Sequence, residues 1–175
     1  MAKRVRRVLA AALAAAALAT SSGCTVRAQT AYSIDGVVTP IEQVVAVSDS
    51  CATAWQGTGY STGTQTIISA MIRAELARQI AAQQHVNYTD DALRQTLSSG
   101  GLGAQLQTML NDAKCGDLAV GLALDALLLY QDGSGYQGAV AERAIVVNPR
   151  FGTWDDTTGS VAGTGSLSKP DAAGG

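Results

Sequence analysis

The sequence predicts a mostly α-helical fold of five helices, completed by a small two-stranded antiparallel β pairing. The chain has 175 residues, of which 47% are apolar and 15% charged, a composition typical of one globular domain with short appendages. Its middle hundred residues are rich in Ala, Gln and Leu and place apolar side chains at helical spacing. Segments rich in β-branched residues flank this region on both sides.

The predicted domain begins with a strand at residues 31–34, followed by a tight turn. Asp35-Gly36 separates two β-forming segments, and this dipeptide favours a short turn. Residues 39–42, Thr-Pro-Ile-Glu, then combine an N-cap residue, a proline at the first helical position and a glutamate at the third. These signals predict that the first helix begins at about residue 40.

Three further helices follow from periodicity and end signals. The second is predicted over residues 64–84, where Ile and Leu recur at four-residue steps. The third, from residue 89 to residue 100, starts at Thr-Asp-Asp, which suits the positive end of a helix dipole. The fourth lies near residues 102–114, and Cys115-Gly116 is expected to end it.

The fifth helix is predicted over residues 118–130, which are apolar nearly all round. Such a segment indicates a central buried helix, because it is too short to span a bilayer. A glycine-rich turn is expected to follow over residues 132–138. Asp125 within the helix needs a partner if it is buried, and Arg143 or Arg150 could pair with it or with Asp35.

A terminal strand is predicted at residues 144–148, in a β-branched run that stops at Asn-Pro. This strand can pair back with residues 31–34, and Pro149 would end the ladder because it has no N–H to donate. Residues 156–175 are polar and Gly-rich, so they are expected to form a disordered tail. Deleting residues 160–175 should then leave the stability of the fold almost unchanged.

The N-terminal residues 1–23 have the layout of a secretory signal peptide, with a basic start, a short apolar stretch and small residues. Ser-Ser-Gly-Cys, ending at Cys24, is similar to a bacterial lipobox, although serine stands where that pattern usually has leucine. We therefore expect an exported cell-membrane lipoprotein that is anchored through Cys24, with a linker over residues 24–30. The alternative is a secreted protein that is cleaved after Ala28.

Export changes how the two remaining cysteines are interpreted. Cys51 and Cys115 would lie in a compartment that permits oxidation, so the pair suggests a disulfide. Two buried thiols are the alternative. The Cys-x-x-Cys spacing of a redox-active pair is absent from the sequence.

The sequence gives no signal of catalysis or of a cofactor. His85 is the only histidine, and no triad, metal-ligand spacing or phosphate-binding glycine motif accompanies it. Without the four basic residues of the signal segment, eight basic residues face fourteen acidic ones, a net charge of −6 that disfavours nucleic-acid binding. We expect a protein that is not an enzyme and that uses no cofactor or metal.

Three segments together carry a resemblance to a known family. They are the strand, turn and helix start over residues 31–44, the paired helices over residues 67–97, and the closing Val-Asn-Pro-Arg-Phe-Gly-x-Trp over residues 147–154. The region 31–155 resembles the SurA N-terminal domain family, the helical chaperone module of extracytoplasmic foldases. The closing motif is similar to a lipoprotein branch of that family in actinobacteria. A parvulin-type isomerase domain is not expected, because only about twenty residues follow the last strand.

The resemblance implies a five-helix SurA-N-like domain that binds unfolded or unassembled polypeptides at the cell envelope, like a chaperone and without catalysis. An apolar groove between helices would hold them, and its candidate residues are Ile68, Met71, Ile72 and Leu106. One alternative is a structural lipoprotein that binds one dedicated envelope partner. The other is a protein related to peptidyl-prolyl isomerases, which the missing parvulin domain disfavours.

Overall fold

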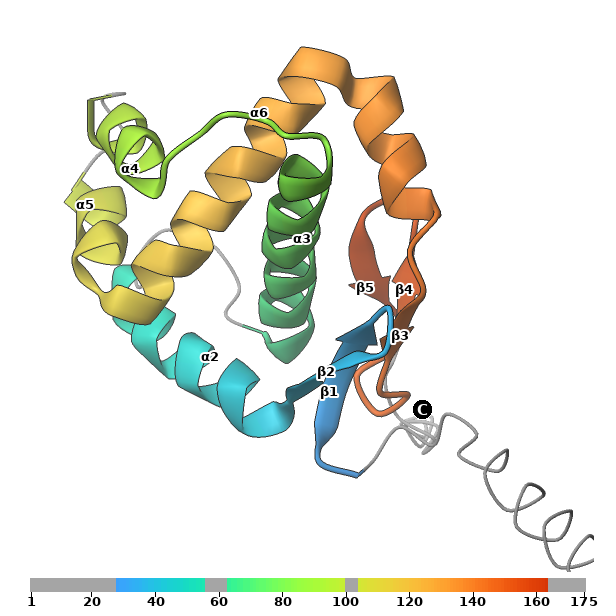
Figure 1. The fold of residues 1–175 in the computed structure, drawn as a ribbon. Helices are drawn as coiled ribbons and strands as arrows, with labels where there is room; N and C mark the ends of the chain where they lie inside the picture. The colour runs from blue at the N-terminus through green and yellow to red at the C-terminus, as the bar shows by residue number, and fades with distance from the viewer. Residues whose placement is uncertain (1–27, 56–62, 100–103, 164–175) are drawn as a thin grey trace, which may run out of the picture.

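The computed structural model describes residues 28–55, 63–99 and 104–163, and these contain five helices and five short strands (Figure 1). In chain order the elements are β1 (Thr30–Ile34), β2 (Val37–Pro40), α2 (Ile41–Trp55), α3 (Thr64–Gln83), α4 (Asp90–Ser99), α5 (Ala104–Asn111), α6 (Ala113–Ala141), β3 (Ile145–Val147), β4 (Thr153–Asp155) and β5 (Ser160–Ala162). The predicted mostly helical fold with a small β component is confirmed.

β1 lies in the middle of a three-stranded sheet with the order β2-β1-β3. The predicted pairing between the two ends of the domain is confirmed, since Tyr32 pairs with Val147 and Ile34 with Ile145, antiparallel. The structure adds β2 as a third strand, antiparallel to β1. β2 has four residues and ends at Pro40, directly before α2. Its last two residues, Thr39 and Pro40, are also part of the helix-start pattern, so the sequence did not predict a strand there.

The turn between β1 and β2 also connects to the end of α6. Asp35 and Gly36 both have positive φ, 50° and 82°, as a two-residue hairpin turn requires. One carboxylate oxygen of Asp35 accepts a hydrogen bond from the Ala144 N–H at 2.9 Å, and the other accepts one from Arg143 at 3.0 Å. The suggested pairing of Arg143 with Asp35 is therefore present, and it joins the β1–β2 hairpin to the segment between α6 and β3.

Acid should weaken this connection. The hydrogen bond from Ala144, followed by that from Arg143, holds the pKa of Asp35 below its ordinary value of 3.8. A carboxyl group with a lower pKa in the folded state stabilises the fold above its unfolded pKa, and this contribution is lost as the pH falls through the folded pKa. Asp35→Asn should therefore flatten the acid side of a plot of melting temperature against pH.

Asp49→Asn is the control, because Asp49 is exposed on α2 and no hydrogen bond to it is found within the described ranges. We expect this variant to keep the wild-type dependence on pH. An identical acid side in Asp35→Asn and wild type would contradict a stabilising role for the Asp35 carboxylate.

α3 and α6 pack together at the centre of the helical body (Figure 1). α3 matches the predicted second helix within one residue, and its Leu76 and Ile80 are buried, as is Leu124 of α6. The two helices approach closely at Gly121, where an added Cβ would meet the Cβ of Ala74 at 2.5 Å. Glycine is thus required at this crossing.

The predicted end of the fourth helix at Cys115-Gly116 is wrong. α5 ends at Asn111, and both residues lie in the first turn of α6. Asp112 causes the break, because its side chain accepts hydrogen bonds from the N–H groups of Lys114 and Cys115 and so caps a new helix.

The predicted glycine-rich turn at residues 132–138 is wrong as well. α6 continues to Ala141 with a kink at Asp132, whose φ of −150° and ψ of 75° are not helical. The Asp132 carboxylate accepts hydrogen bonds from the Gly135 N–H and the Ser134 hydroxyl, so it restarts the helix after the kink. A cap within one turn therefore outweighs the low helix propensity of glycine.

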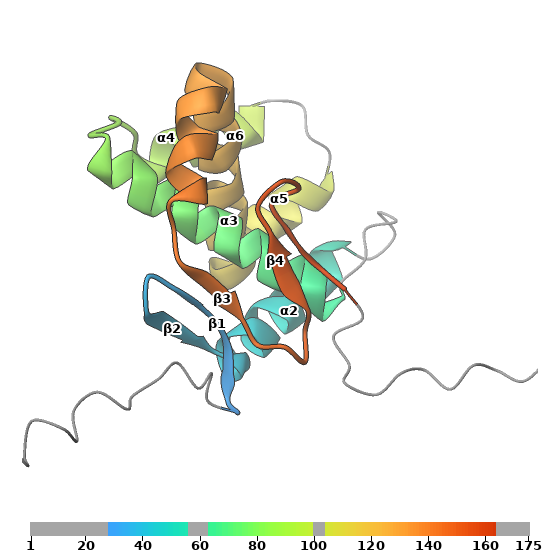
Figure 2. The ribbon, with the colours of Figure 1, turned by 90° about the vertical axis from the view of Figure 1, so that its right-hand side faces the viewer.

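The expectation of a disordered tail over residues 156–175 is wrong up to residue 163. β4 and β5 form an antiparallel hairpin, which lies beside α3 (Figure 2). Val161 is buried, and its N–H donates to the Ser69 hydroxyl at 2.8 Å. Gln65 donates to the carbonyl of Gly163 at 2.7 Å. The polar composition of residues 156–163 indicated disorder, but the buried Val161 side chain anchors this segment to α3.

Deleting residues 160–175 should therefore lower the free energy of unfolding, contrary to the expectation from sequence. The comparison we propose is with a chain that ends after residue 163 and keeps the whole hairpin. The protein that ends before residue 160 lacks the buried Val161 side chain. This loss alone should make its free energy of unfolding about 2 kcal/mol lower than that of the protein that ends after residue 163. Equal urea midpoints for the two truncated proteins would contradict this placement of β5.

Candidate functional site

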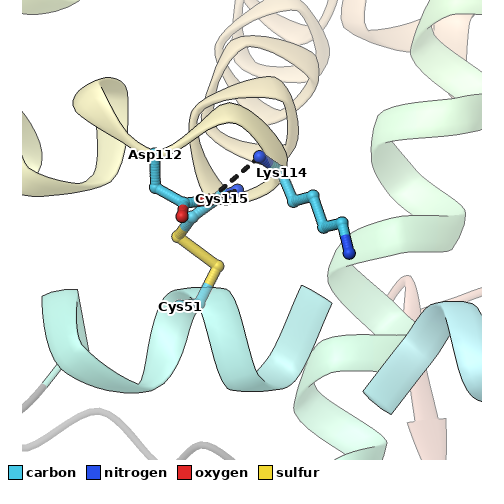
Figure 3. Close-up of a disulfide and its surroundings, with 4 residues drawn as sticks. All are labelled: Cys51, Asp112, Lys114 and Cys115. Atoms are coloured by element: carbon cyan, nitrogen blue, oxygen red, sulfur yellow. Dashed lines mark hydrogen bonds between the residues drawn. A yellow bond between two sulfur atoms is a disulfide. The ribbon is translucent and has the colours of Figure 1, made fainter. Parts of the chain in front are cut away.

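Cys51 of α2 and Cys115 of α6 form a disulfide in the structure (Figure 3). Their Cα atoms are 5.1 Å apart, and both side chains are fully buried. Asp112 lies beside them and caps the start of α6 through the Cys115 N–H at 2.8 Å. The structure thus joins the pair that the sequence suggested, whereas the lipidation candidate Cys24 lies outside the described residues.

The residues proposed to line a peptide groove are not at the surface. Ile68 and Ile72 have no exposed area and Met71 is 7% exposed, so all three belong to the core. The side chain of Leu106, on α5, lies outside the described part. The proposed groove at these positions is therefore wrong: α3 is packed against α2, α6, β1 and β5. An apolar helix stripe has the same sequence pattern in a groove and in a core.

An apolar groove is instead present between α4 and α6, with a volume of about 520 Å³. Its lining comes from both helices and includes Leu93, Leu97, Ala123, Ala126, Leu127 and Tyr130. The α6 residues occupy one stripe at spacings of three and four. Ala126 is exposed, and Tyr130 is 90% exposed at this site. In the sequence, the one indication of this groove is that α6 is apolar nearly all round. A helix buried on every side has the same pattern, so the sequence did not distinguish the two.

Asp125 is the centre of a buried polar cluster. One of its oxygens accepts hydrogen bonds from Nε of Arg73 at 3.1 Å and from Nη2 of the same residue. The other accepts one from the Tyr136 hydroxyl at 2.7 Å. Asp125 is 2% exposed, while the Arg73 side chain is 42% exposed. The buried carboxylate is thus fully paired.

The Tyr136 hydroxyl is a fixed donor in this cluster. Burial, followed by its hydrogen bond to Asp125, raises the pKa of Tyr136 far above its ordinary value. Sequence reasoning identified the need of Asp125 for a partner but suggested Arg143 or Arg150, whereas the partners are Arg73 and Tyr136. Arg73 belongs to the polar side of the α3 pattern, and the pairing of α3 with α6 cannot be read from either helix alone.

Neither a metal site nor a membrane span is found in the described part of the chain. Over residues 28–55, 63–99 and 104–163, no cluster of three or more His, Cys, Asp or Glu side chains could hold a metal ion. No helix within these ranges combines the length and the apolar character that crossing a bilayer requires.

Comparison of the chain with protein-family models, with curated proteins and with solved structures found no match. The resemblance to the SurA N-terminal domain family therefore stays a prediction, and the candidate sites rest on the geometry described above.

Proposed function

We propose that the protein is exported, is anchored to the membrane through a lipid on Cys24, and binds apolar segments of unfolded polypeptides without catalysis. The groove between α4 and α6 carries this proposal. Its walls are leucine and alanine side chains together with Asn87, Tyr88 and Tyr130. The groove therefore offers an open, mostly apolar surface, as pockets that bind apolar ligands do. An occupant would be an unfolded segment that inserts one or two large apolar side chains.

The composition of the groove supports binding of varied segments. Ala123 and Ala126 leave room on the α6 side, and Leu97 and Leu127 are only partly buried. Small side chains beside flexible aliphatic ones accept side chains of different shape, which suits a permissive binding site. Tyr130 adds a large rigid surface at low cost in conformational entropy.

The proposed location rests on two features of the chain. Residues 1–23 have the layout of a signal peptide, and Cys24 follows directly in a sequence similar to a lipobox. The Cys51–Cys115 disulfide is of the kind that persists in oxidising compartments outside the cytosol. Mass spectrometry of the intact protein from its native host tests both, since lipidation adds acyl mass at Cys24 and the disulfide removes two hydrogens.

Charge placed in the groove should abolish binding without unfolding the protein. Ala126→Asp and Tyr130→Asp change exposed side chains, so the core stays intact. We expect the purified protein, without its signal segment, to suppress aggregation of a reduced, unfolded client at stoichiometric excess. Each variant should weaken client binding at least about tenfold, because a carboxylate would be desolvated by an apolar occupant.

Val45→Asp is the matched control, because Val45 is a 49% exposed apolar residue on α2 and does not line the groove. This variant should protect the client as well as wild type does. Absence of protection by wild type would overturn the chaperone-like function and favour a lipoprotein with one dedicated partner. Equal protection by all three variants would place client binding elsewhere on the protein.

A further inference from the structure

A second cavity lies on a different part of the molecule, between α3, the end of α6 and the turn of the β4–β5 hairpin. It has a volume of about 170 Å³ and shares no lining residue with the groove between α4 and α6. Drug-sized ligands occupy pockets of about 300–1,000 Å³. The cavity therefore limits an occupant to about one small ring.

Polar groups in this cavity are fixed in place before any ligand arrives. Asp125, Arg73 and Tyr136 all line it, and their mutual hydrogen bonds hold the guanidinium and the phenol in one arrangement. Asp125 and Tyr136 are 2% and 4% exposed. Arg73 is held through Nε and Nη2, and no partner of its Nη1 group is found among the described residues, so Nη1 can donate to an occupant.

Further polar groups of the lining have no partner in the protein. Across the described ranges, the side chains of Gln137 and Asp156 make no hydrogen bond or ion pair, although both residues line the cavity and are exposed. The buried indole Nε1 of Trp154, another lining residue, is also without an acceptor within these ranges. Donors and acceptors are thus both available here.

The lining also includes apolar side chains. Leu76, Leu129 and Val140 line the cavity together with the Trp154 ring. Asp125 offsets the charge of Arg73, whereas the described part of the chain provides no ion pair to the exposed Asp156, so the lining as a whole disfavours an anion.

From this lining we propose that the cavity is a binding site for a neutral, hydroxyl-rich ring, namely a single sugar unit. The hydroxyl groups of a sugar both donate and accept hydrogen bonds. They could therefore pair with Gln137, Asp156 and the Nη1 group of Arg73. The C–H face of the same ring packs against apolar and aromatic side chains, which matches Trp154 and its neighbours. This site is independent of the proposed polypeptide binding.

Nuclear magnetic resonance on the intact chain provides the test. The protein has two tryptophans, Trp55 and Trp154, and hence two indole N–H signals, which Trp154→Phe assigns. Titration with glucose, mannose or N-acetylglucosamine should shift the Trp154 signal in a saturable way, with a Kd of about 1 mM for the best sugar, and leave the Trp55 signal in place.

Gln137→Ala should raise this Kd at least about tenfold. Gln131→Ala is the matched control, because Gln131 is an exposed glutamine of α6 that does not line the cavity, and it should leave the Kd unchanged. The proposal is overturned if no sugar shifts the Trp154 signal at about 100 mM. It is also overturned if only acetate or an alkylamine shifts that signal, or if the two glutamine variants bind sugar equally.

Discussion

Replacing Cys51 and Cys115 together by serine should lower the melting temperature by about 10 °C or more under oxidising conditions. The disulfide joins residues 64 positions apart, and closing a loop of that size reduces the entropy of the unfolded chain by an amount worth about 4 kcal/mol. It also ties α2, which follows the small sheet, to the start of α6. Thermal unfolding followed by circular dichroism measures the change.

Reductant provides the control for this comparison. Urea unfolding of the wild-type protein with an excess of thiol should give the midpoint of the double serine variant, because neither then has the cross-link. The double variant should show no further change when thiol is added. Equal melting temperatures of variant and wild type under oxidising conditions would be incompatible with a stabilising disulfide.

Arg73→Ala should reduce the free energy of unfolding by about 2 kcal/mol. The change leaves the Asp125 carboxylate, which is 2% exposed, without its cation, and removing one partner of a buried pair costs about 3–5 kcal/mol. The lower value follows because the Arg73 side chain is 42% exposed and solvent screens part of the interaction. Tyr136 keeps donating to Asp125 in this variant.

Arg78→Ala is the matched control on the same helix. Arg78 pairs with Asp117 at 2.8 Å, but the Asp117 side chain is 60% exposed, so this pair should contribute at most about 1 kcal/mol. Urea unfolding of both variants gives the two values side by side. A loss for Arg73→Ala no larger than that for Arg78→Ala would contradict a structural role for the buried cluster.

Local signals in the sequence predicted much of the fold. The turn at Asp35-Gly36, the start of the first helix near Pro40 and the extent of α3 depend on neighbouring residues, and all three are present. Errors arose where a side-chain cap competed with glycine. Asp112 and Asp132 begin helical segments at places where nearby glycines indicated an end or a turn.

The candidate sites were less predictable, because burial depends on which elements pack against a helix. Ile68 and Ile72 have the spacing of a groove, yet the packing of α3 on several sides places them in the core. The groove along Ala126 and Tyr130 arises because α4 covers only part of α6. The partners of Asp125 come from α3 and from beyond the kink, which no local pattern shows.

The position of β1 between β2 and β3 has a consequence for the order in which the chain folds. The Asn148 amide donates to the carbonyl of Thr30, 118 residues earlier, so β1 gains its second neighbour only after α6 has been synthesised. A chain that emerges from its N-terminus must hold Tyr32 and Ile34 without that cover while the helices form. Contacts of such long range slow folding, so we expect the pairing of β3 with β1 to form later than the helices.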